Sequence, residues 1–156
     1  MSAEVAGMAG RYWKAEGQHH ELGGQQQASQ NAYEKAREAY GVLLDKDPRA
    51  YYLADNVGQM SLKVGDIEGA KKAYQKAEEA LTDIMNSSHW SLATAATAVI
   101  VLEREDEAIK HLQSIRQMKP NANDLDRIRA GLRLVQQGLK LTDEQYQNWL
   151  RALGQS

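Results

Sequence analysis

The stretch GQMSLKVGDIEGAKKAY, residues 58–74, decides the fold class of this 156-residue chain. Two glycines separated by six residues interrupt an apolar pattern of helical spacing, although glycine inside a helix costs about 1 kcal/mol relative to alanine. The same frame returns at Gly10–Gly17 and at Gly131–Gly138. We infer that the first glycine of each frame lets two helices pack closely. The second, at Gly17, Gly65 and Gly138, ends a helix.

Residue usage indicates an all-α protein. The chain has two prolines, no phenylalanine, and many alanines and glutamines, which favour helix over strand. Residues 18–30 are predicted to form a mobile, dispensable loop, because they contain a Gly-Gly pair and no apolar periodicity. Asn31 is expected to cap the helix that follows. The predicted helices cover residues 3–16, 31–46, 50–64, 67–85, 90–102, 105–118, 124–137 and 143–153.

The net charge and the lack of cysteine exclude several kinds of binding and catalytic site. The 19 basic and 21 acidic residues leave a net charge of −2, which gives no reason to expect binding to nucleic acid or to a membrane. The absence of cysteine excludes disulfides, thiolate zinc sites and cysteine nucleophiles. The most apolar segment, residues 92–102, is shorter than the roughly 20 residues that cross a bilayer, and no signal peptide is recognised. A soluble, cytoplasmic protein is expected.

A second pattern of alanine, aromatic or leucine, and proline repeats along the chain. Alanine is followed four positions later by an aromatic or leucine, and in two units a proline comes eight positions after that. The members are Ala36, Tyr40 and Pro48; Ala70 and Tyr74; and Ala108, Leu112 and Pro120. Ala36 and Ala70 are 34 residues apart, and Ala70 and Ala108 are 38 apart. Twelve residues before Ala70 and Ala108 stand the small residues Gly58 and Ala96.

This pattern resembles the tetratricopeptide repeat, whose period is about 34 residues. The resemblance implies a right-handed α-α superhelix of about 3.5–4 helix hairpins, with residues 1–156 as a single domain. Repeat 1 would span residues 3–48 with the long loop 18–30, repeat 2 residues 49–85, repeat 3 residues 89–120, and a partial repeat or cap residues 123–154. Glu103 stands where repeat 3 should have its turn glycine.

Three blocks are also similar to the TRAFs-binding tetratricopeptide domain of apoptosis-signal-regulating kinases and bacterial proteins. They are EVAGMAGRYWKA at 4–15, PRAYYLADNVGQM at 48–60 and HWSLATAATAVIVLEREDEAI at 89–109. This narrower resemblance implies a regulatory or docking module.

The resemblance also implies a concave groove lined by the first helix of each repeat. Tyr52 and Arg11 are predicted to anchor a partner. Trp90 either faces the groove or packs beneath the third repeat. Of the positions used by the chaperone-binding subclass to clamp a carboxylate, only Asn56 matches. The predicted groove residues are Arg11, Lys14, Tyr52, Asp55, Gln59, Lys63, Trp90, Ala93 and Thr97.

No residue pattern indicates catalysis. The glycine frames lack the Gly-Lys-Ser/Thr ending of a phosphate loop, and no serine has the surroundings of a nucleophile. The pair His19–His20 with Glu21 is either a metal site or part of a solvated loop, and the loop is favoured because nothing fixes ligand geometry. His89 is expected to cap or pack. We therefore expect neither enzyme activity, nor a cofactor, nor a bound metal.

Two functions remain open. The first is a scaffold that binds a protein or peptide in the groove. The alternative is self-association into a homo-oligomer through exposed Trp149 and Leu150. In either case, Gly58 is predicted to lie close to Ala70 across one hairpin, since small residues at a crossing let helix axes approach.

Overall fold

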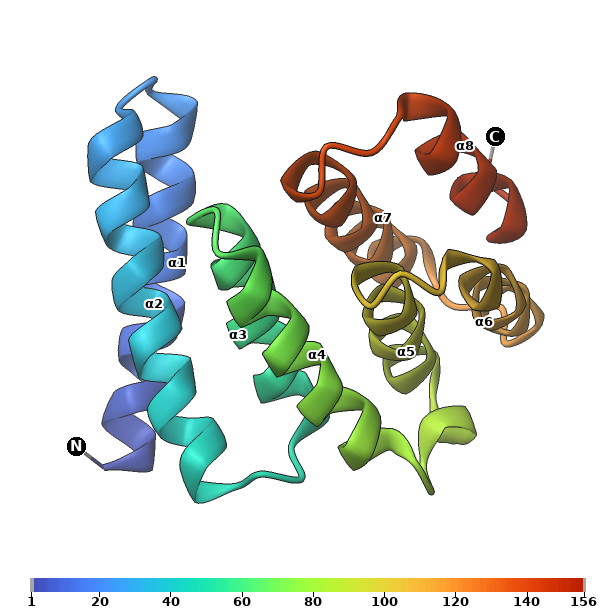
Figure 1. The fold of residues 1–156 in the computed structure, drawn as a ribbon, viewed down its shortest axis with the longest axis horizontal. Helices are drawn as coiled ribbons and strands as arrows, with labels where there is room; N and C mark the ends of the chain where they lie inside the picture. Colours follow the sequence, from blue (N-terminus) through green and yellow to red (C-terminus); the bar gives the residue numbers. More distant parts are fainter. Residues whose placement is uncertain (1, 156) are drawn as a thin grey trace.

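The computed structural model describes residues 2–155, and within them the fold is entirely helical. The predicted all-α class is thereby confirmed. Eight α-helices and one short 3-10 helix follow one another along this part of the chain (Figure 1). Their bounds are α1 Ala3–Leu22, α2 Gln26–Lys46, α3 Tyr51–Lys63, α4 Ile67–Leu81, η1 Met85–Ser87, α5 His89–Val101, α6 Glu105–Gln117, α7 Ala122–Gly138 and α8 Asp143–Ala152.

Consecutive helices pair into hairpins. The pairs α1–α2, α3–α4 and α5–α6 make the most extensive contacts, and α2–α3 and α4–α5 join one hairpin to the next. In Figure 1 the helices α1, α3 and α5 run upward, whereas α2 and α4 run downward. One hydrophobic core continues through all these layers, from Tyr33 in α2 to Leu153 after α8.

In each of the first two hairpins, glycines of one helix pack against tyrosine rings of the other helix. A Cβ atom on Gly10 would lie 2.8 Å from the ring of Tyr40, and one on Gly17 would lie 2.5 Å from that of Tyr33. A Cβ on Gly58 would lie within 2.8 Å of Cδ2 and Cζ of Tyr74, and closer still to Cε2. The close approach inferred from the glycine frames is confirmed at Gly10 and Gly58. At Gly131 it is wrong, because the nearest atom to a Cβ there would be Gln59 Nε2 at 3.9 Å. The three heavy atoms nearest to a Cβ on Gly58 all belong to Tyr74, and the contact with Ala70 stays a prediction.

The predicted loop 18–30 is wrong. Helix α1 continues to Leu22, α2 already begins at Gln26, and Asn31 lies inside α2 instead of capping it. Tertiary contacts stabilise this extension: Ser29 Oγ donates to the Gly17 carbonyl at 3.0 Å, and Gln30 Nε2 donates to the Lys63 carbonyl at 2.7 Å. Gly17 therefore lies inside α1 and does not end it. The absence of a side chain at Gly17 makes room for the ring of Tyr33.

The turns after α3 and α5 share one backbone conformation. Gly65 has a φ of 78° and Glu103 has a φ of 65°, both in the left-handed region. Gly65 thus ends α3 as predicted, and Asp66 beside it caps α4 by accepting from the amide of Gly69 at 2.8 Å. Glu103 adopts at the corresponding turn the conformation that glycine adopts more easily.

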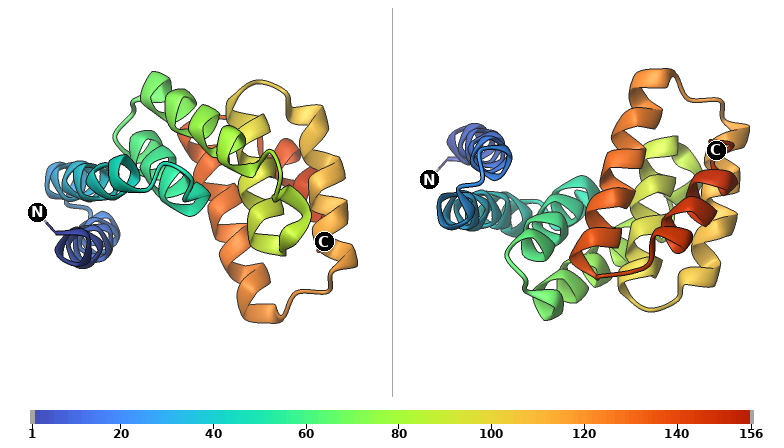
Figure 2. Two further views of the ribbon diagram at one scale, coloured as in Figure 1. Left: turned by 90° about the horizontal axis from the view of Figure 1, so that it is seen from below. Right: turned by 90° about the horizontal axis from the view of Figure 1, so that it is seen from above.

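The last hairpin is placed differently from the first three. Helix α7 packs against both α3 and α5, and α8 packs against α6 and α7 (Figure 2). A Cβ on Gly138 would lie 2.9 Å from Cβ of Leu62 in α3. Glycine thus lets the end of α7 reach a helix that is two hairpins earlier in the chain.

Trp149 and Leu150 are buried, and their predicted exposure is wrong. Trp149 is 0% exposed, and its Nε1 donates to Glu105 Oε1 of α6 at 3.0 Å. Leu150 is also buried. Both side chains attach α8 to the core. Among the helices of residues 2–155, none combines the length and the apolar character needed to span a bilayer.

Candidate functional site

A groove of about 940 Å³ opens between the odd-numbered helices. Helices α1, α3, α5 and α7 all contribute side chains, so the hairpin packing and the position of α7 together create it. We call it the central groove. Its lining residues are Lys14, Gln18, Tyr51, Tyr52, Asp55, Asn56, Gln59, Lys63, Trp90, Ala93, Thr94, Thr97, Arg127, Ile128, Ala130, Gly131, Leu132, Arg133, Leu134 and Gln137.

The groove residues predicted from the sequence lie here, with one exception. Arg11 is exposed on α1 but does not line the central groove. Its guanidinium lies over the side of α1 near Gly7. Trp90 is half-buried at the start of α5, where it lines the groove and also packs against the core. The Trp90 side chain therefore does both things that were considered for it: it faces the groove, and it packs against the core.

Asp55 is a carboxylate in the wall of the groove that is hydrogen-bonded by neighbouring side chains. Tyr74 Oη donates to its Oδ1 at 2.6 Å, Gln59 Nε2 donates to the same oxygen at 3.3 Å, and Thr94 Oγ1 donates to Oδ2 at 3.4 Å. Burial raises the pKa of the Asp55 carboxyl, although these hydrogen bonds and the charge of Lys14 oppose the shift. The same network ties the groove wall to Tyr74, the ring on which Gly58 packs.

Lys14 is the cation nearest to this network. Its Nζ donates to Asn56 Oδ1 at 3.4 Å, which is long for a hydrogen bond from an ammonium group. Burial lowers the pKa of Lys14, and the negative charge of Asp55 opposes that shift. Lys14 is thus half-buried, and within residues 2–155 no carboxylate forms an ion pair with its ammonium group.

The other groove cations differ in how they are paired. Lys63 Nζ contacts both carboxylate oxygens of Glu21 at 3.0 Å, and Arg133 Nη1 contacts Asp143 Oδ1 at 2.9 Å. Arg127 is exposed on α7, and within residues 2–155 it has no ion pair or side-chain hydrogen bond. Lys14 and Arg127 are therefore the groove cations that remain available to a ligand.

Sequence reasoning missed the wall formed by α7. The repeat register did contain a signal for part of it, because Ile128 and Leu132 stand relative to Gly131 as Asp55 and Gln59 stand relative to Gly58. Arg127 and Arg133 carry no such signal. They enter the groove because α7 crosses α3, a contact between residues far apart in sequence.

The histidines occupy helices. His19 and His20 lie in α1, where His20 Nδ1 contacts Gln25 Oε1 at 2.6 Å, so the solvated-loop interpretation of this pair is wrong. His89 Nε2 lies 3.0 Å from Asp124 Oδ2 and links the beginnings of α5 and α7. Across residues 2–155, no group of three or more His, Asp or Glu side chains is arranged to hold a metal ion.

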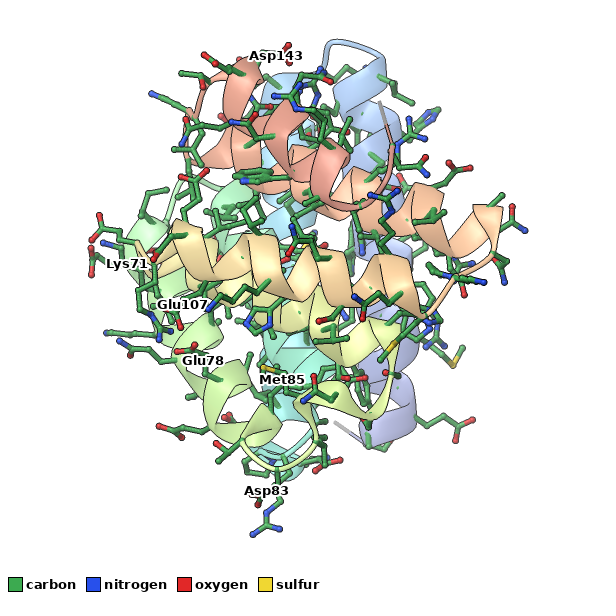
Figure 3. All side chains as sticks on the ribbon, turned by 90° about the vertical axis from the view of Figure 1, so that its right-hand side faces the viewer. Lys71, Glu78, Asp83, Met85, Glu107 and Asp143 are labelled. Atoms are coloured by element: carbon green, nitrogen blue, oxygen red, sulfur yellow. The ribbon has the colours of Figure 1, made fainter. Side chains whose placement is uncertain are left out.

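A second, smaller pocket of about 180 Å³ lies between α4, α5 and α6. The residues that line it include Glu78, Met85 and Glu107, which are labelled in Figure 3, and also His111. Arg104 forms ion pairs with both glutamates. The positive charge of Arg104 is therefore already balanced by these two carboxylates. Burial lowers the pKa of His111.

No protein-family model matches this sequence, and no curated protein matches it significantly.

Proposed function

We propose that this chain is a protein-interaction domain of the tetratricopeptide type. In this proposal α1–α6 are three stacked hairpins of a right-handed superhelix, and α7–α8 form its cap. The central groove binds a peptide or an extended segment of a partner protein, and the domain acts as a scaffold without catalysis. The observation that carries the proposal is the groove of about 940 Å³, which one helix from each hairpin lines.

The packing of the hairpins supports the repeat. Gly58 and Tyr74 are 16 residues apart, as are Ala96 and Leu112, and the last three of these are fully buried. In the first unit Gly10 meets Tyr40 in the same way, with the extra residues taken up by the longer α1 and α2. A small residue against a large one in the first two hairpins, and the same pair of sizes at the same spacing in the third, agree with a repeat of common design.

The surface chemistry of the groove supports binding of a polypeptide. Tyr52 is 55% exposed and Trp90 is half-buried, so both rings offer apolar area to a ligand. Asn56, Gln59 and Gln137 place amide groups among them. Tyrosine and tryptophan dominate binding energy when a partner encloses them, and amides can pair with a peptide backbone.

Peptide selection with matched variants tests this function. Peptides selected from a random dodecapeptide display library should lose affinity roughly tenfold or more for Tyr52→Ala and for Trp90→Ala. Tyr12→Ala is the matched control, because Tyr12 is also 55% exposed but does not line the groove. Circular dichroism verifies folding. Equal affinity for all three variants would contradict a groove function.

A second candidate function is self-association, favoured by one surface of α1. Val5, Met8 and Tyr12 are each more than half exposed and follow helical spacing along this first helix. Because Trp149 and Leu150 are buried, α1 replaces them as the surface for a second copy of the chain. Light scattering separates the candidates: a mass that stays monomeric as concentration rises contradicts assembly, and a dimer abolished by Met8→Glu supports it.

A further inference from the structure

The central groove is more basic than the protein that surrounds it. Its lining contains four cations, Lys14, Lys63, Arg127 and Arg133, and a single carboxylate, Asp55. The chain as a whole has two more acidic than basic residues. Positive charge is thus gathered on this one concave surface, opposite in sign to the net charge.

The carboxylate of Asp55 is already engaged as a hydrogen-bond acceptor within the protein. Both of its carboxylate oxygens already accept hydrogen bonds, from Tyr74 and Gln59 at Oδ1 and from Thr94 at Oδ2. These donors come from α4, α3 and α5, so the carboxylate acts as a structural junction between three helices. A ligand therefore meets mainly the cations of the groove.

Two of those cations, Lys14 and Arg127, form no ion pair within residues 2–155. An ammonium group has three donors and a guanidinium has five. Lys14 uses one donor, in a 3.4 Å hydrogen bond to Asn56, and Arg127 uses none within residues 2–155. Lys63 and Arg133, in contrast, are paired with Glu21 and Asp143. Lys14 projects from α1 and Arg127 from α7, the first and last helices that line the groove.

We propose that the occupant of the central groove is an acidic peptide segment, whose carboxylates pair with Lys14 and Arg127 while its apolar side chains pack on Tyr52 and Trp90. This inference rests on the proposed function and specifies the chemistry of the ligand. A carboxylate at Lys14 supplies the close anionic partner that the half-buried ammonium lacks. Charge-assisted hydrogen bonds of this kind are about twice as strong as neutral ones.

The composition of selected peptides tests the inference directly. Dodecapeptides selected on the wild-type chain should be enriched in Asp and Glu, and their affinity should fall as salt rises from about 0.05 to 0.5 M, because screening weakens exposed charge pairs. The variant Lys14→Gln/Arg127→Gln should bind them at least roughly tenfold more weakly. The control Lys76→Gln/Lys110→Gln removes the same charge from exposed sites outside the groove and should change affinity less than about twofold.

The outcomes separate this inference from the function on which it rests. Neutral or basic peptides that still lose affinity with Tyr52→Ala would overturn the acidic ligand and leave the groove function standing. Selected peptides whose affinity changes with neither Tyr52→Ala nor Trp90→Ala would contradict both proposals. A single-stranded DNA dodecamer that binds more tightly than the selected peptides would overturn the assignment to a peptide. Undiminished binding of acidic peptides to the Lys14→Gln/Arg127→Gln variant would overturn the pairing.

Discussion

Replacing Gly58 by alanine tests the packing on which the repeat depends. The added Cβ would lie within 2.8 Å of three carbon atoms of the Tyr74 ring, a separation that real side chains do not tolerate. The ring cannot easily withdraw, because Tyr74 is fully buried and its hydroxyl donates to Asp55 at 2.6 Å. One methyl group must therefore displace either the ring or the backbone of α3.

The expected magnitude follows from two opposing terms. Overpacking of a filled core costs about 1–3 kcal/mol, and we take about 3 kcal/mol because the ring is held at both ends. Alanine recovers about 1 kcal/mol of helix propensity relative to glycine. The free energy of unfolding should therefore fall by about 2 kcal/mol, which lowers Tm by about 4–8 °C in a protein of this size.

Gly41→Ala is the matched control for this change. Gly41 also lies inside a helix, α2, but a Cβ there would meet no atom within 4 Å. The same substitution should stabilise the protein by about 1 kcal/mol at this site, because only the propensity term remains. Thermal and urea unfolding followed by circular dichroism measure both variants.

A double variant identifies the ring as the cause. Gly58→Ala/Tyr74→Leu imitates Ala96 and Leu112 of the third hairpin, so it should cost less than the sum of its two single changes. If Gly58→Ala proves as stable as the wild type, the close approach of α3 and α4 at this point is refuted. Gly58→Leu should be still more destabilising, since its larger side chain cannot fit without movement of the helices.

The remaining predictions concern a turn, the cap and a buried carboxyl. Glu103→Gly should stabilise the protein by about 0.5–1 kcal/mol in urea unfolding, since glycine accepts a φ of 65° without steric cost, and a loss of stability would contradict this. Trp149→Ala should cost about 3–5 kcal/mol and lower Tm sharply, whereas an unchanged Tm would show that α8 is dispensable. Burial raises the pKa of Asp55, so the folded state binds its proton more tightly than the unfolded state, and the stability contributed by this group falls as pH rises above about 4. Wild type should therefore gain stability relative to Asp55→Asn as pH is lowered from about 7 to about 4; a difference independent of pH would be the contrary result.

Local sequence signals were sufficient for most helices and for three hairpins. Pro48 and Pro120 end α2 and α6 as expected, and Gly65 forms the turn that its position indicated. These signals act over a few residues, so they can be seen without knowledge of the fold. The repeat register predicts most groove residues of α3 and α5 because it assigns the same face to each hairpin, but it misses Tyr51 and Thr94.

The errors occurred where distant contacts decide the structure. Residues 18–30 lack apolar periodicity, yet they are largely helical because Ser29 and Gln30 donate to carbonyls of α1 and α3. The register placed Arg11 in the groove, but its side chain lies over α1 near Gly7. Arg127 was missed because the path of α7 depends on the contact of Gly138 with Leu62, which no local pattern encodes.

Amide NMR spectra of the labelled protein, titrated with a selected peptide, test the central claim most directly. The account predicts that the largest shifts lie in α1, α3, α5 and α7, and that they include the side-chain N–H groups of Trp90 and Gln59 in the central groove. Shifts confined to α2, α4 and α6, with the groove signals unchanged, would contradict it.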